Sequence, residues 1–292
     1  MTFAIAGVSG NTGRVAAETL LAQGKKVRVI VRDAAKGEPW RSKGAEVAVA
    51  DLGDQTALAA ALAGAEGAYL LVPPNMGAPD FRGYQERTVA SIRWALERSG
   101  VPHVVFLSSV GAQHLAGTGP IAGLHLAEEA FGSLEKTVFS FVRAAYFMEN
   151  LGGSLGMLGQ GLLPSFTPAD LGIDMIATAD IGRLAAGLLV EGARETRIIE
   201  LGGPARSMND VAAVLSRLMG KPVKVHEAPV EAVVPTFTGF GMSQQMAELY
   251  REMIEGIIKG HVAFEGGHRR VAGTTGLETV LGAMLAAPAT AH

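Results

Sequence analysis

The sequence of 292 residues contains no cysteine, few aromatic residues and almost no excess of charge of either sign. Without cysteine the chain can form no disulfide bond, no cysteine–metal centre and no thiol nucleophile. A net charge of −3, with no basic run, argues against a nucleic-acid partner or an anionic membrane surface. No apolar run is long enough to cross a bilayer, and the histidines show no metal-ligand spacing. These absences, and a first strand that begins at Phe3, favour a cytoplasmic protein without a bound metal.

Glycine, by contrast, is abundant, and the N-terminus arranges it in an informative order. An apolar run, Phe3–Ala6, is followed by three evenly spaced glycines and then by apolar residues at helical spacing over Arg14–Leu21. This order of strand, tight turn and helix is the one that binds a dinucleotide, because the pyrophosphate must reach backbone N–H groups at a helix N-terminus. The spacing GxxGxxG is a variant of the usual GxGxxG, and a glycine-rich turn of another α/β protein is the alternative. The residues predicted to contact the phosphates are Gly7, Ser9, Gly10, Asn11, Thr12 and Gly13.

The end of the second predicted strand, Lys26–Val31, bears on the choice of cofactor. NAD-binding folds carry an acidic residue at this place, whereas this chain has Arg32, with Lys36 one helical turn further. A guanidinium favours the 2′-phosphate, so we predict NADP(H) in preference to NAD(H). Asp33, directly beside Arg32, counts against this preference, and an exposed basic residue without a ligand is the alternative.

The first half of the chain alternates strands with helices. This pattern, with apolar strands buried on both sides, predicts a Rossmann-type doubly wound parallel sheet. Further strands are expected at Glu46–Ala50, Gly67–Val72, His103–Leu107 and Thr137–Val142. Ligands of such sheets bind at the carboxyl ends of the strands. Cofactor contacts are therefore also predicted for Asp51, Leu52, Val72, Pro73 and Ser108. Asp51 has an alternative role as the cap of a helix over Gln55–Ala63.

The composition changes after Asn150, where short apolar pieces alternate with Gly-rich turns. We expect residues 1–150 to form the NADP-binding domain, and residues 151–292 a smaller α+β substrate-cap domain that is partly interleaved with it. In this second part Thr178–Asp180 is expected to cap a helix, Pro235–Gly241 to form a loop, and the Ala/Pro-rich tail after Leu285 to fray.

Several longer segments go beyond a generic nucleotide fold. They are GVSGNTG, VRDAAK, SSVGA, GLHLAEEA, FVRAAYFMEN and DIGRLAA. Through them the chain resembles the NmrA-like, atypical short-chain dehydrogenase/reductase proteins, and most of all the branch of NAD(P)H:quinone oxidoreductases and triphenylmethane-dye reductases. The resemblance covers nearly the whole chain and implies a Rossmann domain, NADP(H) and a small C-terminal domain. It does not fix the activity, because some members reduce substrates and others sense the nicotinamide pool and bind a transcription factor.

The Tyr-x-x-x-Lys pair of common short-chain dehydrogenases is absent. The corresponding segment, Pro120–Leu124, reads PIAGL, and no tyrosine of the chain is followed by lysine four residues later. Carbonyl reduction or nucleotide-sugar epimerisation through such a pair is therefore disfavoured. Direct hydride transfer to a flat acceptor that is already electrophilic, most plausibly a quinone, remains open. A non-catalytic NADP(H)-binding sensor that regulates a partner protein is the alternative.

Two residues are candidates for the chemistry. His125 can polarise the acceptor or relay a proton near neutral pH, with Glu129 one turn further to orient it. A structural histidine and a solvated glutamate are the alternatives. Tyr146 follows the sixth strand at the crevice and is the second catalytic candidate. The predicted binding residues for an aromatic or quinone-like substrate are Tyr146, Phe147, Asn150 and Phe237, with core packing or helix capping as alternatives. The oligomeric state is open, a homodimer being one candidate.

Overall fold

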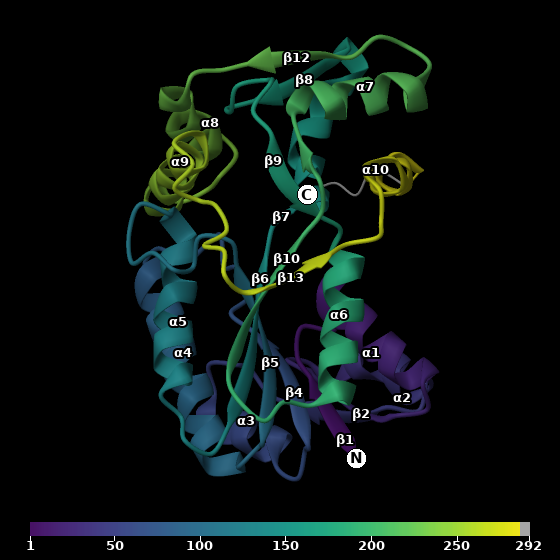
Figure 1. Cartoon of the computed structure of the whole chain (residues 1–292), viewed down its shortest axis with the longest axis vertical. Helices are drawn as coiled ribbons and strands as arrows, with labels where there is room; N and C mark the ends of the chain where they lie inside the picture. Colours follow the sequence, from purple (N-terminus) through teal and green to yellow (C-terminus); the bar gives the residue numbers. More distant parts are fainter. Residues whose placement is uncertain (287–292) are drawn as a thin grey trace.

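The computed structural model describes residues 1–286 and is built around one fully parallel, eight-stranded sheet (Figure 1). In spatial order its strands are β13 (Arg269–Ala272), β10 (Arg197–Gly202), β6 (Val138–Ala144), β5 (His103–Ser109), β4 (Gly67–Leu71), β1 (Thr2–Ile5), β2 (Lys26–Val31) and β3 (Glu46–Val49). Every neighbouring pair runs parallel. The carboxyl ends of all eight strands therefore lie along one edge of the sheet, called here the carboxyl edge.

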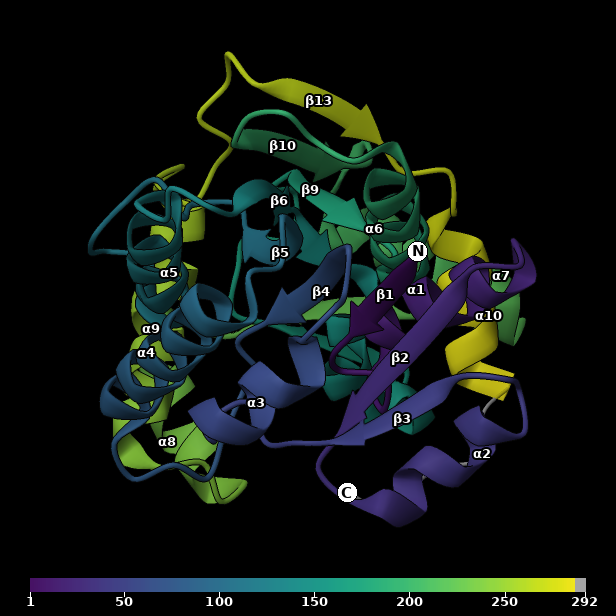
Figure 2. The ribbon, with the colours of Figure 1, turned by 90° about the horizontal axis from the view of Figure 1, so that it is seen from below.

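Helices cover both faces of this sheet, as Figure 2 shows. One face packs against α1 (Asn11–Ala22), α2 (Glu38–Arg41) and α6 (Thr178–Glu191), and the other against α3 (Gln55–Leu62), α4 (Phe81–Ser99) and α5 (Ala122–Gly132). Each face has its own cluster of buried apolar side chains, and strands such as HVVFL alternate between the two clusters. The predicted Rossmann-type doubly wound sheet is confirmed.

The strand order reverses at β1. From β1 the chain passes to β2 and β3 in one direction, and then returns to β4, β5 and β6 on the other side. Open α/β sheets bind ligands at the carboxyl ends beside such a reversal, because the two connections leave in opposite directions and open a crevice. The turn after β1 is therefore the place where this fold receives a dinucleotide.

The chain after residue 150 contributes to two parts of the molecule. Strands β10 and β13 join the large sheet, and helix α6 packs on one face of it. The remaining elements of this part, together with strand β7, lie beyond the carboxyl edge (Figure 1). They surround a third cluster of buried apolar side chains or lie beside it. They are β7 (Tyr146–Phe147), β8 (Leu162–Ser165), β9 (Ile173–Ile176), β11 (Ala205–Arg206), β12 (Lys224–Glu227), α7 (Met208–Met219), α8 (Val233–Gly239), α9 (Gln244–Ile258) and α10 (Leu277–Ala286).

Two local expectations were wrong. Residues 235–241 were expected to form a loop, but Val233–Gly239 is helical, and Pro235 lies in its first turn, where a missing N–H breaks no intrahelical bond. Thr178 does not precede its helix but begins it, after Ala177. The cap comes from Glu149, whose carboxylate accepts hydrogen bonds from the Thr178 backbone N–H at 3.0 Å and from its hydroxyl at 2.5 Å.

Strand β13 and helix α10 were not anticipated from the sequence. The fraying expected after Leu285 concerns mainly residues 287–292, which lie outside the described part of the chain. Among the helices of residues 1–286, none combines the length and the hydrophobicity that a membrane span requires.

His103, at the start of β5, gives the fold a specific pH dependence. Its Nε2 lies within hydrogen-bond distance of the Ser140 hydroxyl, at 3.1 Å, and the same oxygen accepts from Arg197 Nε. Burial lowers the pKa of His103 from 6.5 to about 4. Between these values the unfolded chain binds a proton that the folded chain does not, so stability falls as the pH drops from about 6.5 towards about 4. We expect His103→Gln to remove about 2 kcal/mol of this loss, measured by urea unfolding at both ends of the range. An unchanged pH dependence would contradict the assignment.

Candidate functional site

The turn after β1 has a geometry that requires glycine at two places. Gly7 has a φ of +68°, the left-handed region that side chains disfavour. A Cβ on Gly13 would lie 2.6 Å from the carbonyl oxygen of Gly7 and would also meet the Ala6 carbonyl, so α1 can approach the turn only without a side chain there. The Gly10 N–H donates to the Gly7 carbonyl at 2.9 Å and closes the turn.

Helix α1 presents an uncapped N-terminus at this turn. The first N–H groups of a helix lack an intrahelical acceptor. The N-cap residue of α1 is Gly10, and within residues 1–286 no side chain accepts from these N–H groups as a cap. The N–H groups of Asn11, Thr12 and Gly13 can therefore bind a pyrophosphate. Ser9 and Asn11 are exposed and fit the predicted phosphate contacts. The Thr12 side chain is buried instead and accepts a hydrogen bond from the Tyr69 hydroxyl at 2.9 Å, which leaves Thr12 its backbone N–H.

Two basic residues lie exposed beyond the end of β2. Within the described residues no carboxylate pairs with Arg32 or Lys36. Asp33 forms no ion pair with Arg32, and its carboxylate accepts from the Ala35 N–H at 2.9 Å, so two basic side chains stand here against one carboxylate. The charge arrangement at this corner is therefore basic and open to an anionic ligand.

The loops after β3 and β4 meet around Tyr84 of helix α4. The Tyr84 hydroxyl donates to the Pro73 carbonyl at 3.1 Å, burial raises the pKa of Tyr84, and Asp51 and Arg32 are near enough to act on it. The structure thus brings three of the predicted cofactor residues together. Two more, Leu52 and Val72, are half-buried and pack against the core below.

The alternative role of Asp51 as a helix cap is wrong. Its carboxylate accepts from the Gly53 N–H at 2.7 Å, whereas Asp54 caps α3 by accepting from the N–H groups of Thr56 and Ala57. Asp51 instead holds the turn that follows β3.

His125 lies in the first turns of α5 and is half-buried. Its Nδ1 is 2.9 Å from the carbonyl oxygen of Ala112, which can only accept, so Nδ1 carries the proton and Nε2 is the ring nitrogen left for a ligand. The expected orienting role of Glu129 is wrong, because Glu129 is exposed and the Ala112 carbonyl holds the ring instead. The buried carboxylate of this helix belongs to Glu128.

Aromatic side chains gather beyond the end of β6. Phe237 packs edge-on against Phe166 and Tyr250, with ring centroids 5.7 and 5.4 Å apart. The Tyr250 hydroxyl lies 3.8 Å from the sulfur of Met76, in the loop after β4. Burial, with a contribution from Tyr250, raises the pKa of Tyr146 to about 12. This aromatic group is chemically suited to a flat ligand, and Tyr146 stays a neutral phenol in it.

The two other predicted substrate residues lie differently. Phe147 follows Tyr146 in β7 and so points to the opposite side, against the core between the sheet and α1 and α6. Asn150 is exposed within the 3₁₀ helix Met148–Gln160 rather than at its start, so it does not cap that helix.

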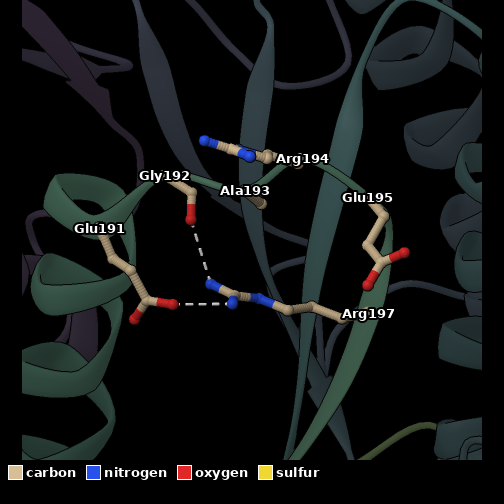
Figure 3. Close-up of a pocket in the computed structure, with 6 residues that line it drawn as sticks. All are labelled: Glu191, Gly192, Ala193, Arg194, Glu195 and Arg197. Carbon is tan, nitrogen blue, oxygen red and sulfur yellow. Dashed lines mark hydrogen bonds and ion pairs between the residues drawn. The ribbon is translucent and has the colours of Figure 1, made fainter.

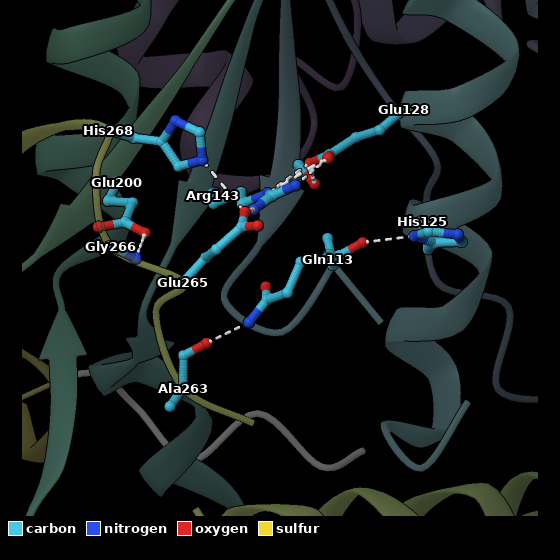
Figure 4. Close-up of polar contacts among 11 residues, drawn as sticks. Gln113, His125, Glu128, Arg143, Glu200, Ala263, Glu265, Gly266 and His268 are labelled. Carbon is cyan, nitrogen blue, oxygen red and sulfur yellow. Dashed lines mark hydrogen bonds and ion pairs between the residues drawn. The ribbon is translucent and has the colours of Figure 1, made fainter. Parts of the chain in front are cut away.

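A buried ion pair at the end of β6 was missed from the sequence (Figure 4). Arg143 of β6 binds Glu128 of α5 through two nitrogens, with Nη2–Oε2 at 2.6 Å. The Ser108 hydroxyl donates to the same carboxylate at 2.5 Å, so the side chain predicted to contact the cofactor is engaged here. An arginine at the end of the apolar run TVFSFV was the available signal, since a buried arginine requires a buried carboxylate.

A surface hollow lies away from this edge (Figure 3). It measures about 470 Å³, and residues 191–195 and Arg197 line it where α6 ends and β10 begins. Arg197 is already bound to the Glu191 carboxylate at 2.8 Å and to the Gly192 carbonyl at 3.2 Å. Because this hollow adjoins the amino ends of the strands, it is not the dinucleotide site. Within residues 1–286 no three His, Asp or Glu side chains are placed to hold a metal ion.

The fold and the carboxyl-edge site define a dinucleotide-binding protein of the Rossmann class. The chain belongs to the NmrA-like family, whose model matches residues 1–256. It is 30% identical over 256 residues to an NAD(P)H azoreductase of Xenophilus azovorans, covering 84% of this chain and 85% of that protein. It is 26% identical over 272 residues to quinone oxidoreductase 2 of Escherichia coli, covering 88% of each.

Solved structures agree with this fold. An NADPH-dependent quinone oxidoreductase from Escherichia coli, complexed with NADPH, superposes with a TM-score of 0.81 at 23% identity, over 97% of this chain and 99% of that chain. The triphenylmethane reductase of Citrobacter sp., complexed with NADP(H), superposes with a TM-score of 0.75 at 21% identity, over 97% and 95%.

Proposed function

We propose that this protein is an NADPH-dependent reductase that transfers hydride directly to a flat, electron-poor acceptor, above all a quinone. It is an NAD(P)H-dependent oxidoreductase, as its relatives named azoreductase and quinone oxidoreductase are. The observation that carries the finer proposal is the layout of the carboxyl edge. An uncapped helix end suited to phosphate lies at β1, and an aromatic group lies beyond β6, across the central strands.

We assign separate roles to the residues at this edge. The N–H groups at the start of α1 bind the pyrophosphate, and Arg32 and Lys36 bind the 2′-phosphate. NADPH supplies the hydride when it is bound. Tyr146 and Phe237 orient a flat acceptor by stacking and keep water away from it. His125 offers Nε2, so a proton taken up from solvent at this atom can be passed to the reduced acceptor.

No tyrosine in this chain can act as the acid of a tyrosine–lysine pair. Lysine is missing four residues after every tyrosine, and burial keeps the pKa of Tyr146 near 12 rather than lowering it. A quinone does not need such an acid before hydride transfer, because its ring is already electrophilic. The proton can follow afterwards, so the missing pair is compatible with this acceptor class and not with an ordinary ketone.

The cofactor preference depends on Arg32. We expect Arg32→Asp to raise the Kd for NADPH at least about 30-fold, through the loss of a charge-assisted bond worth about 2 kcal/mol, and to change the Kd for NADH little. Fluorescence titration of both cofactors measures this. Arg41→Asp is the control, because it makes the same change in net charge on exposed helix α2. An equal loss for both cofactors would show that Arg32 does not bind the 2′-phosphate.

The second candidate function is a non-catalytic NADP(H) sensor that regulates a partner protein, and the missing Tyr–Lys pair is the observation in its favour. A deuterium isotope effect separates the two functions. If the protein transfers hydride, NADPH deuterated at the transferred position should be consumed with a quinone more slowly than NADPH. A sensor would bind NADPH and NADP⁺ with different affinities and consume neither form.

A further inference from the structure

The buried ion pair of Arg143 and Glu128 joins four separate segments near the candidate active site (Figure 4). Ser108 and Arg143 are direct register partners on β5 and β6, so their side chains project to the same face of the sheet. Both bind Glu128 on α5. On its other side, Arg143 Nη1 donates to Glu265 at 2.6 Å, in the segment between α9 and β13, and Glu265 also contacts His268.

A second set of hydrogen bonds joins helix α5 to the turn that follows β5. The Ala112 N–H donates to the Ser109 carbonyl at 3.1 Å and closes this turn, and the Val110 N–H donates to the Ala144 carbonyl at 2.9 Å. The Ala112 carbonyl then accepts from His125 Nδ1. His125 and Glu128 are three residues apart on α5 and so lie on one face of it. The polar cluster therefore binds α5 to Ser108 at the end of β5, and His125 binds the same helix to Ala112 in the turn that follows.

The charged side chains of this cluster are almost completely buried. Arg143 is 4% exposed and Glu128 9%. A buried ion pair adds little net stability compared with apolar side chains of the same size, because desolvation offsets the attraction. Its bidentate geometry, however, restricts the mutual position of the two segments. Such a pair is suited to holding α5 against β5 and β6 next to His125, which lies three residues before Glu128 on this helix.

We propose that Ser108, Glu128 and Arg143 are positioning residues for His125. They hold α5 on the turn after β5, so that Nδ1 stays protonated on the Ala112 carbonyl and Nε2 remains the ring nitrogen available to the substrate. This inference deepens the proposed reductase function and rests on it for the role of Nε2. The arrangement of the ring itself can be measured without turnover.

The first test reads the His125 ring by ¹⁵N NMR of the full-length protein, in the wild type and in Glu128→Gln. The wild type should show the Nδ1-protonated tautomer. The variant should shift towards the Nε2-protonated form that unconstrained histidines prefer, while exposed His226 of β12 stays unchanged. An identical His125 tautomer in both proteins would overturn the proposal, whether or not the protein reduces quinones.

The second test compares turnover with folding. Glu128→Gln should lower kcat with a quinone at least about 10-fold and leave the Kd for NADPH unchanged, because the phosphates bind at the other half of the sheet. Glu191→Gln, which removes a charge at the amino edge, should leave kcat unchanged. The apolar triple variant Ser108→Ala, Glu128→Leu, Arg143→Met keeps a filled core and should remain folded but slow. Wild-type kcat in the triple variant would show that the cluster is only structural.

The two tests separate the inference from the function on which it rests. If wild-type protein fails to oxidise NADPH with any quinone, the proposed function fails, and the NMR comparison still decides whether the cluster sets the His125 ring. If turnover is present and both comparisons show no change in Glu128→Gln, the positioning role fails and the reductase function stands.

Discussion

Replacing Gly13 by alanine is expected to weaken NADPH binding by about 100-fold, or about 2.7 kcal/mol. The new Cβ would lie 2.6 Å from the Gly7 carbonyl oxygen, and both Gly7 and Ala6 present rigid backbone rather than flexible side chains at this contact. Relief requires α1 to move away from the turn, which displaces the N–H groups that receive the pyrophosphate. Titration of NADPH against the purified variant measures the effect.

The matched control is Gly187→Ala on helix α6, the helix that packs against α1. A Cβ at Gly187 meets no atom within 4 Å, and alanine is the better helix former by about 1 kcal/mol. This variant should bind NADPH like the wild type and be at least as stable. If Gly13→Ala also bound NADPH normally, the turn after β1 would not be the phosphate site.

Replacing Arg143 by methionine is expected to lower the free energy of unfolding by about 3–5 kcal/mol. The change leaves the Glu128 carboxylate buried without its counter-ion, and the Ser108 hydroxyl alone does not compensate. Urea unfolding followed by circular dichroism measures the difference.

Arg270→Met serves as the comparison for this stability prediction. Arg270 also binds a carboxylate, that of Asp174 at 3.0 Å, but its side chain is 48% exposed. Exposed pairs contribute about 0–1 kcal/mol, so this variant should unfold almost like the wild type. Equal losses in the two variants would mean that burial of the Arg143 pair is not what makes it important.

The part of the fold that could be predicted from the sequence is the part with local signals. The strands up to β6 are short apolar runs ended by glycine, proline, serine or charged residues, and the structure places them within a few residues of the expected positions. The glycine turn was recognised for the same reason, since strand, glycines and helix are contiguous. Such signals need no knowledge of which segments meet in space.

The missed features depend on contacts between distant residues. Strand β13 begins with Arg269 and Arg270 and has no apolar run, because as an edge strand it is only half covered. The cap of α6 comes from Glu149, 29 residues before Thr178. Likewise, Glu128 and Glu129 are equivalent in sequence, and only the position of Arg143 on β6 decides which one is buried.

The proposed function is tested most directly by NADPH oxidation with purified protein and a small panel of quinones, with NADH measured in parallel. We expect quinone-dependent consumption of NADPH, slower consumption of NADH, and little activity with simple ketones. Tight binding of NADPH without turnover on any quinone would contradict the reductase function and favour the sensor.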